Sequence, residues 1–152
     1  MSRSLTRVTE ALRAAGIDAA PVAIGGCRSA AEAAAAVGCI VDRIAKSIVF
    51  ARGEGCAIFL AAGGRQVDPA RAEVLAGGPL ARAEAAHVRA VTGFAIGGVS
   101  PVGHVTPSPV WMDRHLMAFE TVWAAAGTPD HVFEIAPADL LRAAGATVAD
   151  FT

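Results

Sequence analysis

Two near-continuous apolar runs, separated by a short glycine-containing turn, constrain the fold of this chain more than any other feature. The first run covers residues 46–51 and the second covers residues 56–61, with Gly53-Glu54-Gly55 between them. A turn of this composition joins antiparallel strands, and strands that are apolar throughout are typical of a sheet covered on both faces. We therefore predict a central β-hairpin in the interior of the protein.

The rest of the chain alternates irregularly between short helices and short strands. Apolar spacing and capping residues predict helices at residues 4–15, 30–37, 69–76, 84–91 and 137–144, with one helical turn at 41–44. Shorter strands are predicted at residues 18–24, 80–82, 119–123, 131–135 and 147–149. The spacing is too irregular for a doubly wound sheet, so we predict one α+β domain over residues 1–152. The weakly apolar 30–37 helix is expected to be a flap rather than part of the core.

Composition argues against a membrane protein. Alanine accounts for 36 residues and explains the high apolar fraction, but no apolar run approaches the roughly 18 residues that a spanning helix requires. The first residues carry Arg3, Arg7 and Glu10 and lack the apolar block of a signal peptide. We therefore expect a cytoplasmic protein.

The net charge limits the kind of nucleic-acid partner that we expect. The formal net charge is −1, whereas proteins that grip long duplexes through phosphates carry a basic excess. Any nucleic-acid contact is therefore expected to be local, at an end or at a single nucleotide.

The number of cysteines is odd, and they form no C-x-x-C motif; they are Cys27, Cys39 and Cys56. We expect all three to be buried small side chains, and we predict no metal and no cofactor.

A glycine-rich segment at residues 93–104 is the strongest candidate for a functional loop. It contains Gly93, Gly97, Gly98 and Gly103, with Pro101 between the last two. Glycine lets a ligand approach the backbone closely, and proline restricts the conformation of the loop. Consecutive backbone N–H groups at 97–98 can form an anion-binding concavity or an oxyanion hole. The alternative is a tight connection between two strands.

Lys46 is the other candidate. Of the 13 basic residues, 12 are arginine and Lys46 is the single lysine. Lysine is a compact point charge with three donors, and this one lies where a helical turn enters the first central strand. Its ammonium is therefore expected to point into a cleft. The alternative is a surface lysine whose stem packs along the end of the strand.

The remaining polar candidates each have a structural alternative. Asp113 is either a site carboxylate or, as we favour, the N-cap of a helical turn at 114–117. His104 either lines the loop or, as we favour, hydrogen-bonds a backbone carbonyl. Ser47 and Ser100 lack an evident histidine and carboxylate partner, and Asp113-x-His115 is too small a cluster for a metal site. No P-loop, Rossmann fingerprint or G-x-S-x-G motif is present.

Taken together, these motifs resemble the YbaK/prolyl-tRNA synthetase editing-domain family. Ile44-Ala45-Lys46-Ser47 leads into an apolar strand and places Lys46 on the characteristic lysine of the family. Gly97-x-x-x-Pro101 matches the G-x-x-x-P loop of the family, and the final Ala149-Asp150 also fits, so the resemblance covers nearly the whole chain. It implies a mixed, barrel-like sheet surrounded by helices, in a free-standing protein, since no synthetase domain is present in this sequence.

The resemblance also implies an activity, which is hydrolysis of the ester of a mischarged aminoacyl-tRNA, usually a tRNA for proline. Lys46, Gly97 and Gly98 would act at the ester, with water attack assisted by the 2′-hydroxyl of the substrate. The expected substrate-binding residues are Ser47, Val99, Ser100, Pro101, His104 and Asp113. The expected partner is the acceptor end of the tRNA, with prolyl-tRNA synthetase or an elongation factor as a further candidate and with neither membrane nor DNA involved.

Two other classes of function stay open at this stage. The chain either binds an aminoacyl-adenosine or tRNA end without turnover, or hydrolyses another small aminoacyl ester without tRNA. The sequence does not distinguish among alanine, serine, threonine, cysteine and 2-aminobutyrate as the amino acid removed.

Overall fold

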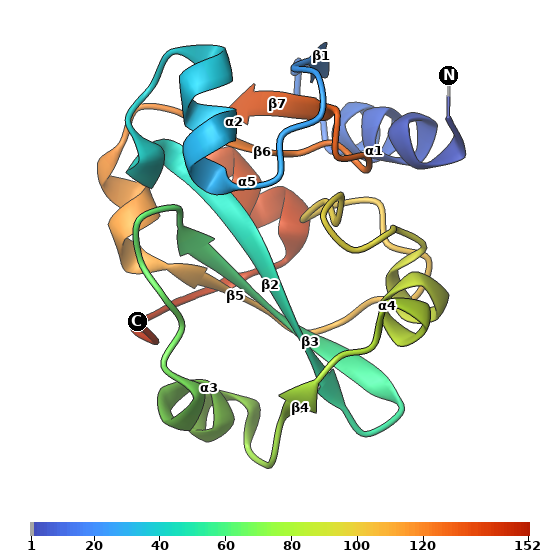
Figure 1. Ribbon diagram of the computed structural model, residues 1–152, viewed down its shortest axis with the longest axis vertical. Helices are drawn as coiled ribbons and strands as arrows, with labels where there is room; N and C mark the ends of the chain where they lie inside the picture. The colour runs from blue at the N-terminus through green and yellow to red at the C-terminus, as the bar shows by residue number, and fades with distance from the viewer. Residues whose placement is uncertain (1) are drawn as a thin grey trace.

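The predicted hairpin forms the centre of the molecule in the computed structural model, which describes residues 2–152. Strand β2 (Ile44–Arg52) pairs antiparallel with β3 (Gly55–Ala62), in a register that runs from Ala45↔Ala62 to Arg52↔Gly55. Figure 1 shows these two strands crossing the middle of the molecule. Every residue of β3 after Gly55 is buried, which confirms that this strand is covered on both faces.

The sheet is mixed and has eight strands in the order β1-β7-β6-β2-β3-β5-β8, while β4 pairs with β2 outside this path. The outer strands are β1 (Val22–Ala23), β4 (Ala81–Arg82), β5 (Val110–Asp113), β6 (Val122–Ala125), β7 (His131–Ile135) and β8 (Thr147–Ala149). β2 pairs antiparallel with β3 but parallel with β6, and β3 pairs parallel with β5. The predicted α+β class is confirmed.

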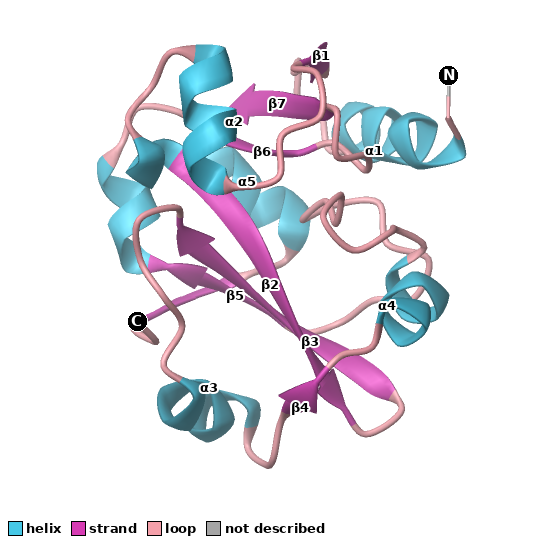
Figure 2. Ribbon diagram, viewed as in Figure 1, coloured by secondary structure: helices cyan, strands magenta, loops and turns pink. Residues whose placement is uncertain are grey.

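Helices surround the sheet (Figure 2). They are α1 (Arg3–Ala14), α2 (Ala30–Val37), α3 (Pro69–Ala76), α4 (Ala85–Thr92) and α5 (Pro137–Ala144), with 3₁₀ turns η1 (Val41–Arg43) and η2 (Arg114–Ala118). The predicted caps set several boundaries: Ser29 Oγ accepts from Glu32 N at the start of α2, and Gly38 ends that helix in the left-handed conformation.

No helix within residues 2–152 is both long enough and apolar enough to cross a bilayer.

Two apolar clusters pack on opposite faces of the central strands. Ile58 and Leu60 belong to the larger cluster with Phe94 and Phe133. Phe59, which alternates with them along β3, points to the other face, where its ring centroid lies 5.0 Å from those of Trp111 and of Phe151. The period-two alternation of a strand explains why neighbouring residues enter different clusters.

Two of the predicted strands differ from the observed strands by several residues. The strand expected at 18–24 is reduced to Val22–Ala23, because it pairs only with His131 and Val132 at one end of the sheet. The strand expected at 119–123 begins only at Val122, since η2 extends to Ala118 and is followed by Phe119 at its C-cap.

β2 has a divided second edge, and this feature positions the site. On that edge β6 pairs with Ile44 and Ala45, whereas β4 pairs with Phe50 and Ala51. Within residues 2–152, positions 46–49 have no strand partner on this side. The sheet therefore contains a notch between the end of β6 and β4.

Candidate functional site

A pocket of about 720 Å³ opens at the β6 end of this notch. Four segments line it, taken from residues 24–33, 44–47, 96–99 and 123–132. α2 supplies one wall through Ala30 and Ala33, so the helix that we expected to be a flap borders the pocket. The pocket brings together four of the predicted site residues: Lys46, Ser47, Gly97 and Val99.

Lys46 extends from β2 into this region and is half-buried. Its Nζ donates to the carbonyl oxygen of Gly63 at 3.3 Å. The carbonyl belongs to the turn that follows β3, next to Lys46 in the hairpin. The ammonium of this pocket-lining residue is therefore bonded to one backbone acceptor, which lies outside the lining. Ser47 also lines the pocket, and its Oγ is buried without a hydrogen-bond partner among residues 2–152.

The glycine loop contributes Ile96, Gly97 and Val99 to the pocket. Gly97 has a φ of +90°, and a Cβ placed there would meet no atom within 4 Å. Gly98 has a different role, because its N–H already donates to Ala95 O at 3.0 Å. A Cβ on Gly98 would lie 2.8 Å from the backbone carbon of Thr128. The expectation that Gly98 offers a free backbone donor is therefore corrected: this glycine permits close packing between the loop and residues 128–129.

Ser100, Pro101 and His104 belong to the loop but are absent from the pocket lining. Ser100 is buried, and its Oγ accepts from Val102 N at 3.1 Å. His104 Nε2 lies 2.5 Å from Ser100 O, which confirms the favoured hydrogen bond to a backbone carbonyl. Burial lowers the pKa of His104, and Arg7 contributes in the same direction while the Ser100 hydrogen bond opposes it. These hydrogen bonds join residues within the loop and help to fix its conformation.

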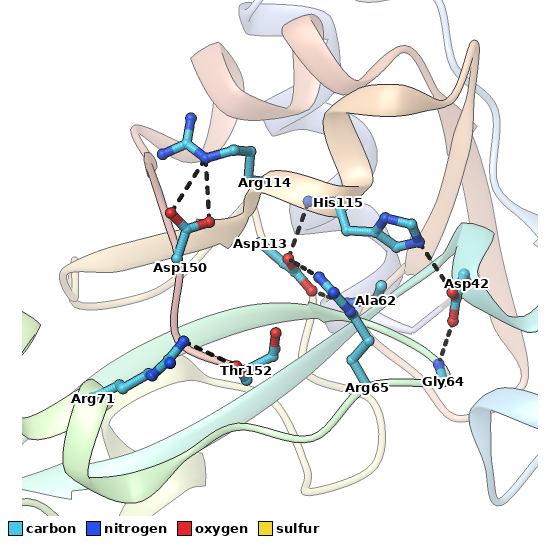
Figure 3. A network of polar contacts seen from close by, with 10 residues as sticks. All are labelled: Asp42, Ala62, Gly64, Arg65, Arg71, Asp113, Arg114, His115, Asp150 and Thr152. Atoms are coloured by element: carbon cyan, nitrogen blue, oxygen red, sulfur yellow. Dashed lines mark hydrogen bonds and ion pairs between the residues drawn. The ribbon is translucent and has the colours of Figure 1, made fainter.

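Asp113 lies outside the pocket lining and is only 1% exposed. It accepts from His115 N at 3.0 Å, which confirms its favoured role as the N-cap of η2. It also accepts from Ala62 N at 3.2 Å and from Arg65 Nη1 at 3.3 Å. Figure 3 shows the carboxylate between these partners. Its position makes Asp113 a brace for the turn after β3, since a buried carboxylate needs partners of this kind.

Several pocket residues were not found from the sequence. Thr128 Oγ1 lies 2.7 Å from His131 Nδ1, and both residues line the pocket with Arg28 and Trp123. Only the turn at 127–130 and the strand after it were visible in the sequence pattern, and neither indicates an inward-facing pair. The described lining includes Lys46 and Arg28 but neither aspartate nor glutamate. Such a lining favours an anionic ligand.

The profile of one protein family matches residues 25–143, and its description is the aminoacyl-tRNA editing domain. The match covers most of the chain and includes Lys46 and the whole glycine loop. The chain belongs to the aminoacyl-tRNA editing domain family. Within this editing domain, every pocket-lining residue except Ile24 falls inside the matched range.

Individual proteins are similar to this chain over most or all of its length. An uncharacterized Bacillus subtilis (strain 168) protein, YwhH, is 35% identical over 111 residues, which cover 72% of this chain and 70% of the relative. A crystal structure described as a candidate trans-editing enzyme for prolyl-tRNA synthetase is 45% identical, with a TM-score of 0.93 over 100% of this chain and 98% of its own. A scaffold used for computational epitope grafting is 43% identical, with a TM-score of 0.94 over 100% of this chain and 99% of its own. The editing-domain fold thus extends over all the described residues.

Proposed function

We propose that this editing domain is a trans-acting aminoacyl-tRNA deacylase that hydrolyses the ester of a mischarged tRNA, with a tRNA for proline carrying a small wrong amino acid as its substrate. One observation carries the proposal: Lys46 and Gly97, which are far apart in the sequence, meet in one pocket that lacks carboxylates among its described lining residues. Family membership supplies the substrate class, and the 45% identical structure motivates the choice of tRNA.

The charge and size of the pocket support binding of a tRNA end. Lys46 and Arg28 offer positive charge to the phosphate of the terminal nucleotide. A volume of about 720 Å³ lies within the range of pockets that enclose small ligands. Because the net charge of the whole chain is −1, this local positive charge favours recognition of the acceptor end rather than of the full tRNA.

Catalysis in this proposal relies on positioning rather than on a covalent intermediate. The N–H of Gly97 would donate to the ester oxygen as negative charge develops on it, and Lys46 would orient the ester or its neighbouring phosphate. A bound water attacks the carbonyl carbon, the 2′-hydroxyl of the substrate assists it, and the C–O bond to the ribose breaks. The products are the free amino acid and the tRNA with its terminal hydroxyl restored.

The test is an assay of the purified protein against a panel of aminoacyl-tRNAs, with alanine, serine, threonine, cysteine and 2-aminobutyrate on a tRNA for proline. Release of at least one amino acid well above the uncatalysed rate is expected, and correctly charged tRNA should survive. Binding of a non-hydrolysable aminoacyl-adenosine without turnover of any tRNA would replace the proposal with a binding module. Equal hydrolysis of short aminoacyl esters would show that tRNA is not required.

A further inference from the structure

A tight turn follows β3 and lies beside Lys46. Arg65 N donates to Ala62 O at 2.9 Å, which closes a four-residue β-turn whose central residues are Gly63 and Gly64. The carbonyl of Gly63 and the N–H of Gly64 belong to the same peptide group. Since a peptide group is planar and rigid, these two atoms can only rotate together.

The two ends of this peptide group contact side chains of opposite charge. Lys46 Nζ donates to Gly63 O at 3.3 Å, and Gly64 N donates to Asp42 Oδ1 at 2.8 Å. The second oxygen of Asp42 lies 3.0 Å from Nε2 of His115, so the carboxylate is itself held in place (Figure 3). Asp42 and Lys46 are thus linked through one peptide unit, and each hydrogen bond polarises the unit in favour of the other.

Glycine at both central positions makes this orientation easy to lose. Neither residue has a positive φ here. A flip of the central peptide converts a β-turn to the type that requires a positive φ at the third position, and Gly64 can adopt that conformation without strain. Such a flip would turn the carbonyl away from Lys46 and present an N–H to its ammonium.

Other contacts brace the turn without fixing its central peptide. Asp113 holds Ala62 N and the Arg65 side chain, which lie at the two ends of the turn. Side chains at the centre are excluded, because a Cβ on Gly63 would collide with Val41 O and one on Gly64 with Asp42 Oδ1. Asp42 and Lys46 are the side chains that bond to the central peptide itself.

We propose that Asp42 is a positioning residue that orients the Gly63–Gly64 peptide and thereby aims the Lys46 ammonium into the pocket. This role rests on the proposed deacylase function only for its effect on rate, since the link between Asp42 and Lys46 is a property of the free protein. Asp42 is absent from the pocket lining and would not touch the substrate.

The single lysine of the chain allows a direct test, because protein labelled with ¹³C,¹⁵N-lysine reports on Lys46 alone. In Asp42→Ala, the Lys46 side-chain signals should move towards those of a free lysine. In a second sample that is uniformly labelled with ¹⁵N, the Gly64 amide proton signal should move upfield. Asp42→Asn should leave both signals close to wild type, because its amide oxygen still accepts from Gly64 N–H. Asp150→Ala is the matched control, since it removes an exposed carboxylate that pairs with Arg114. Unchanged Lys46 signals in Asp42→Ala would overturn the proposal.

The deacylation rate of the variants provides the second test of the proposal. Asp42→Ala should lower kcat for deacylation by about 10- to 100-fold, which is the scale of a misplaced active-site group. Added to Lys46→Ala, the same change should lower the rate by less than about threefold further, because the two residues act through one contact. Full additivity of the two variants would overturn the proposal. Asp42→Thr, whose hydroxyl is one atom too short to reach Gly64, repeats the comparison if Asp42→Ala does not fold.

The two arms separate failure of this inference from failure of the proposed function. A wild-type protein without deacylase activity would remove the function, while the lysine signals would still decide whether Asp42 orients Lys46. If the wild-type protein is active but the Lys46 signals do not change in Asp42→Ala, only the inference about Asp42 is wrong.

Discussion

Single residues in this editing domain have roles that depend on which of their atoms are already bonded. Lys46 makes one weak contact, at 3.3 Å to Gly63 O, and keeps further donor capacity for a ligand. Gly98, in the same predicted motif as Gly97, has its N–H engaged by Ala95. Adjacent glycines in one loop therefore differ, because Gly97 lines the pocket and Gly98 packs against Thr128.

Replacing Lys46 by alanine should lower deacylation by about 10- to 1000-fold, because one positioned charge-assisted contact is worth roughly 1.5–4 kcal/mol. Lys46→Arg should also be impaired, since a planar guanidinium does not reproduce a point charge in a confined site. Steady-state kinetics on the preferred aminoacyl-tRNA, with thermal unfolding to verify the fold, measure both effects. Full activity in Lys46→Ala would exclude it from the site.

The two glycines should respond differently to alanine. Gly98→Ala forces a Cβ to within 2.8 Å of the Thr128 backbone and should lower the free energy of unfolding by about 1–3 kcal/mol. Gly97→Ala meets no neighbour but strains a φ of +90°, at about 1 kcal/mol or more, and should mainly reduce kcat. Urea unfolding and kinetics on both variants separate the effects. Equal stability of Gly98→Ala and wild type would contradict the packing role.

At the scale of secondary-structure elements, the site depends on a strand with two incomplete neighbours. β2 is nine residues long, whereas β6 and β4 each pair with only two of its residues on the shared edge. Of the residues between them, Lys46 and Ser47 border the pocket instead of another strand. α2 closes one side through small alanine side chains, so the segment that leads into it, including Cys27, also reaches the pocket.

The expectation that all three cysteines are buried holds for Cys56 but not for Cys27 and Cys39, which are partly exposed. The three thiols should therefore differ in reactivity. Burial raises the pKa of Cys39 and of Cys56, which keeps both protonated. Cys27 lines the pocket, so a bulky maleimide on it should block the substrate. Cys27→Ala should keep wild-type activity and resist maleimide, as measured by deacylation before and after treatment. Loss of activity in untreated Cys27→Ala would instead indicate a cysteine nucleophile.

At the scale of the whole molecule, the first helix holds the glycine loop. Arg7 of α1 donates to Gly93 O at 2.6 Å and to Gly103 O at 3.3 Å, and its guanidinium lies 5.0 Å from the Phe94 ring centroid. His104 packs edge-on against the same ring at 5.4 Å. α1 lies outside the range matched by the family, yet it closes the base of the loop that lines the pocket.

Acid should destabilise the protein through His104. Its pKa is lowered in the folded state, chiefly by burial, so below about pH 6.5 the unfolded chain binds a proton that the folded chain does not. Stability should therefore fall as the pH drops from about 6.5 towards the lower folded-state pKa. His104→Gln removes this proton uptake, and its Tm should decline less between pH 7 and pH 5 than that of wild type. Parallel declines would exclude His104 as the cause.

Local sequence patterns were sufficient for most of the elements. The hairpin, the α2 and α3 caps, β7, α5 and β8 were predicted from patterns that extend over only a few residues. One example is Asp68, which accepts from Ala70 N at the start of α3. Observed strand boundaries differ from the predicted ones where a contact with a distant element sets the boundary. Val122 begins β6 in part because the Arg43 side chain binds Thr121 O at 2.8 Å and fixes the chain just before it.

The sequence by itself determined the central hairpin, the capped helices and the two motifs that contain Lys46 and Gly97, because each depends on neighbouring residues. Tertiary structure decided the notch along β2, the inward pairing of Thr128 with His131, and the bond between Asp42 and Gly64. Each of these features joins residues from separate elements. Hydrophobic periodicity and motif spacing are local, so they do not predict which distant strand edge or backbone donor a side chain will contact. Gly97 and Gly98 look equivalent in the sequence and are distinguished only by Ala95 and Thr128.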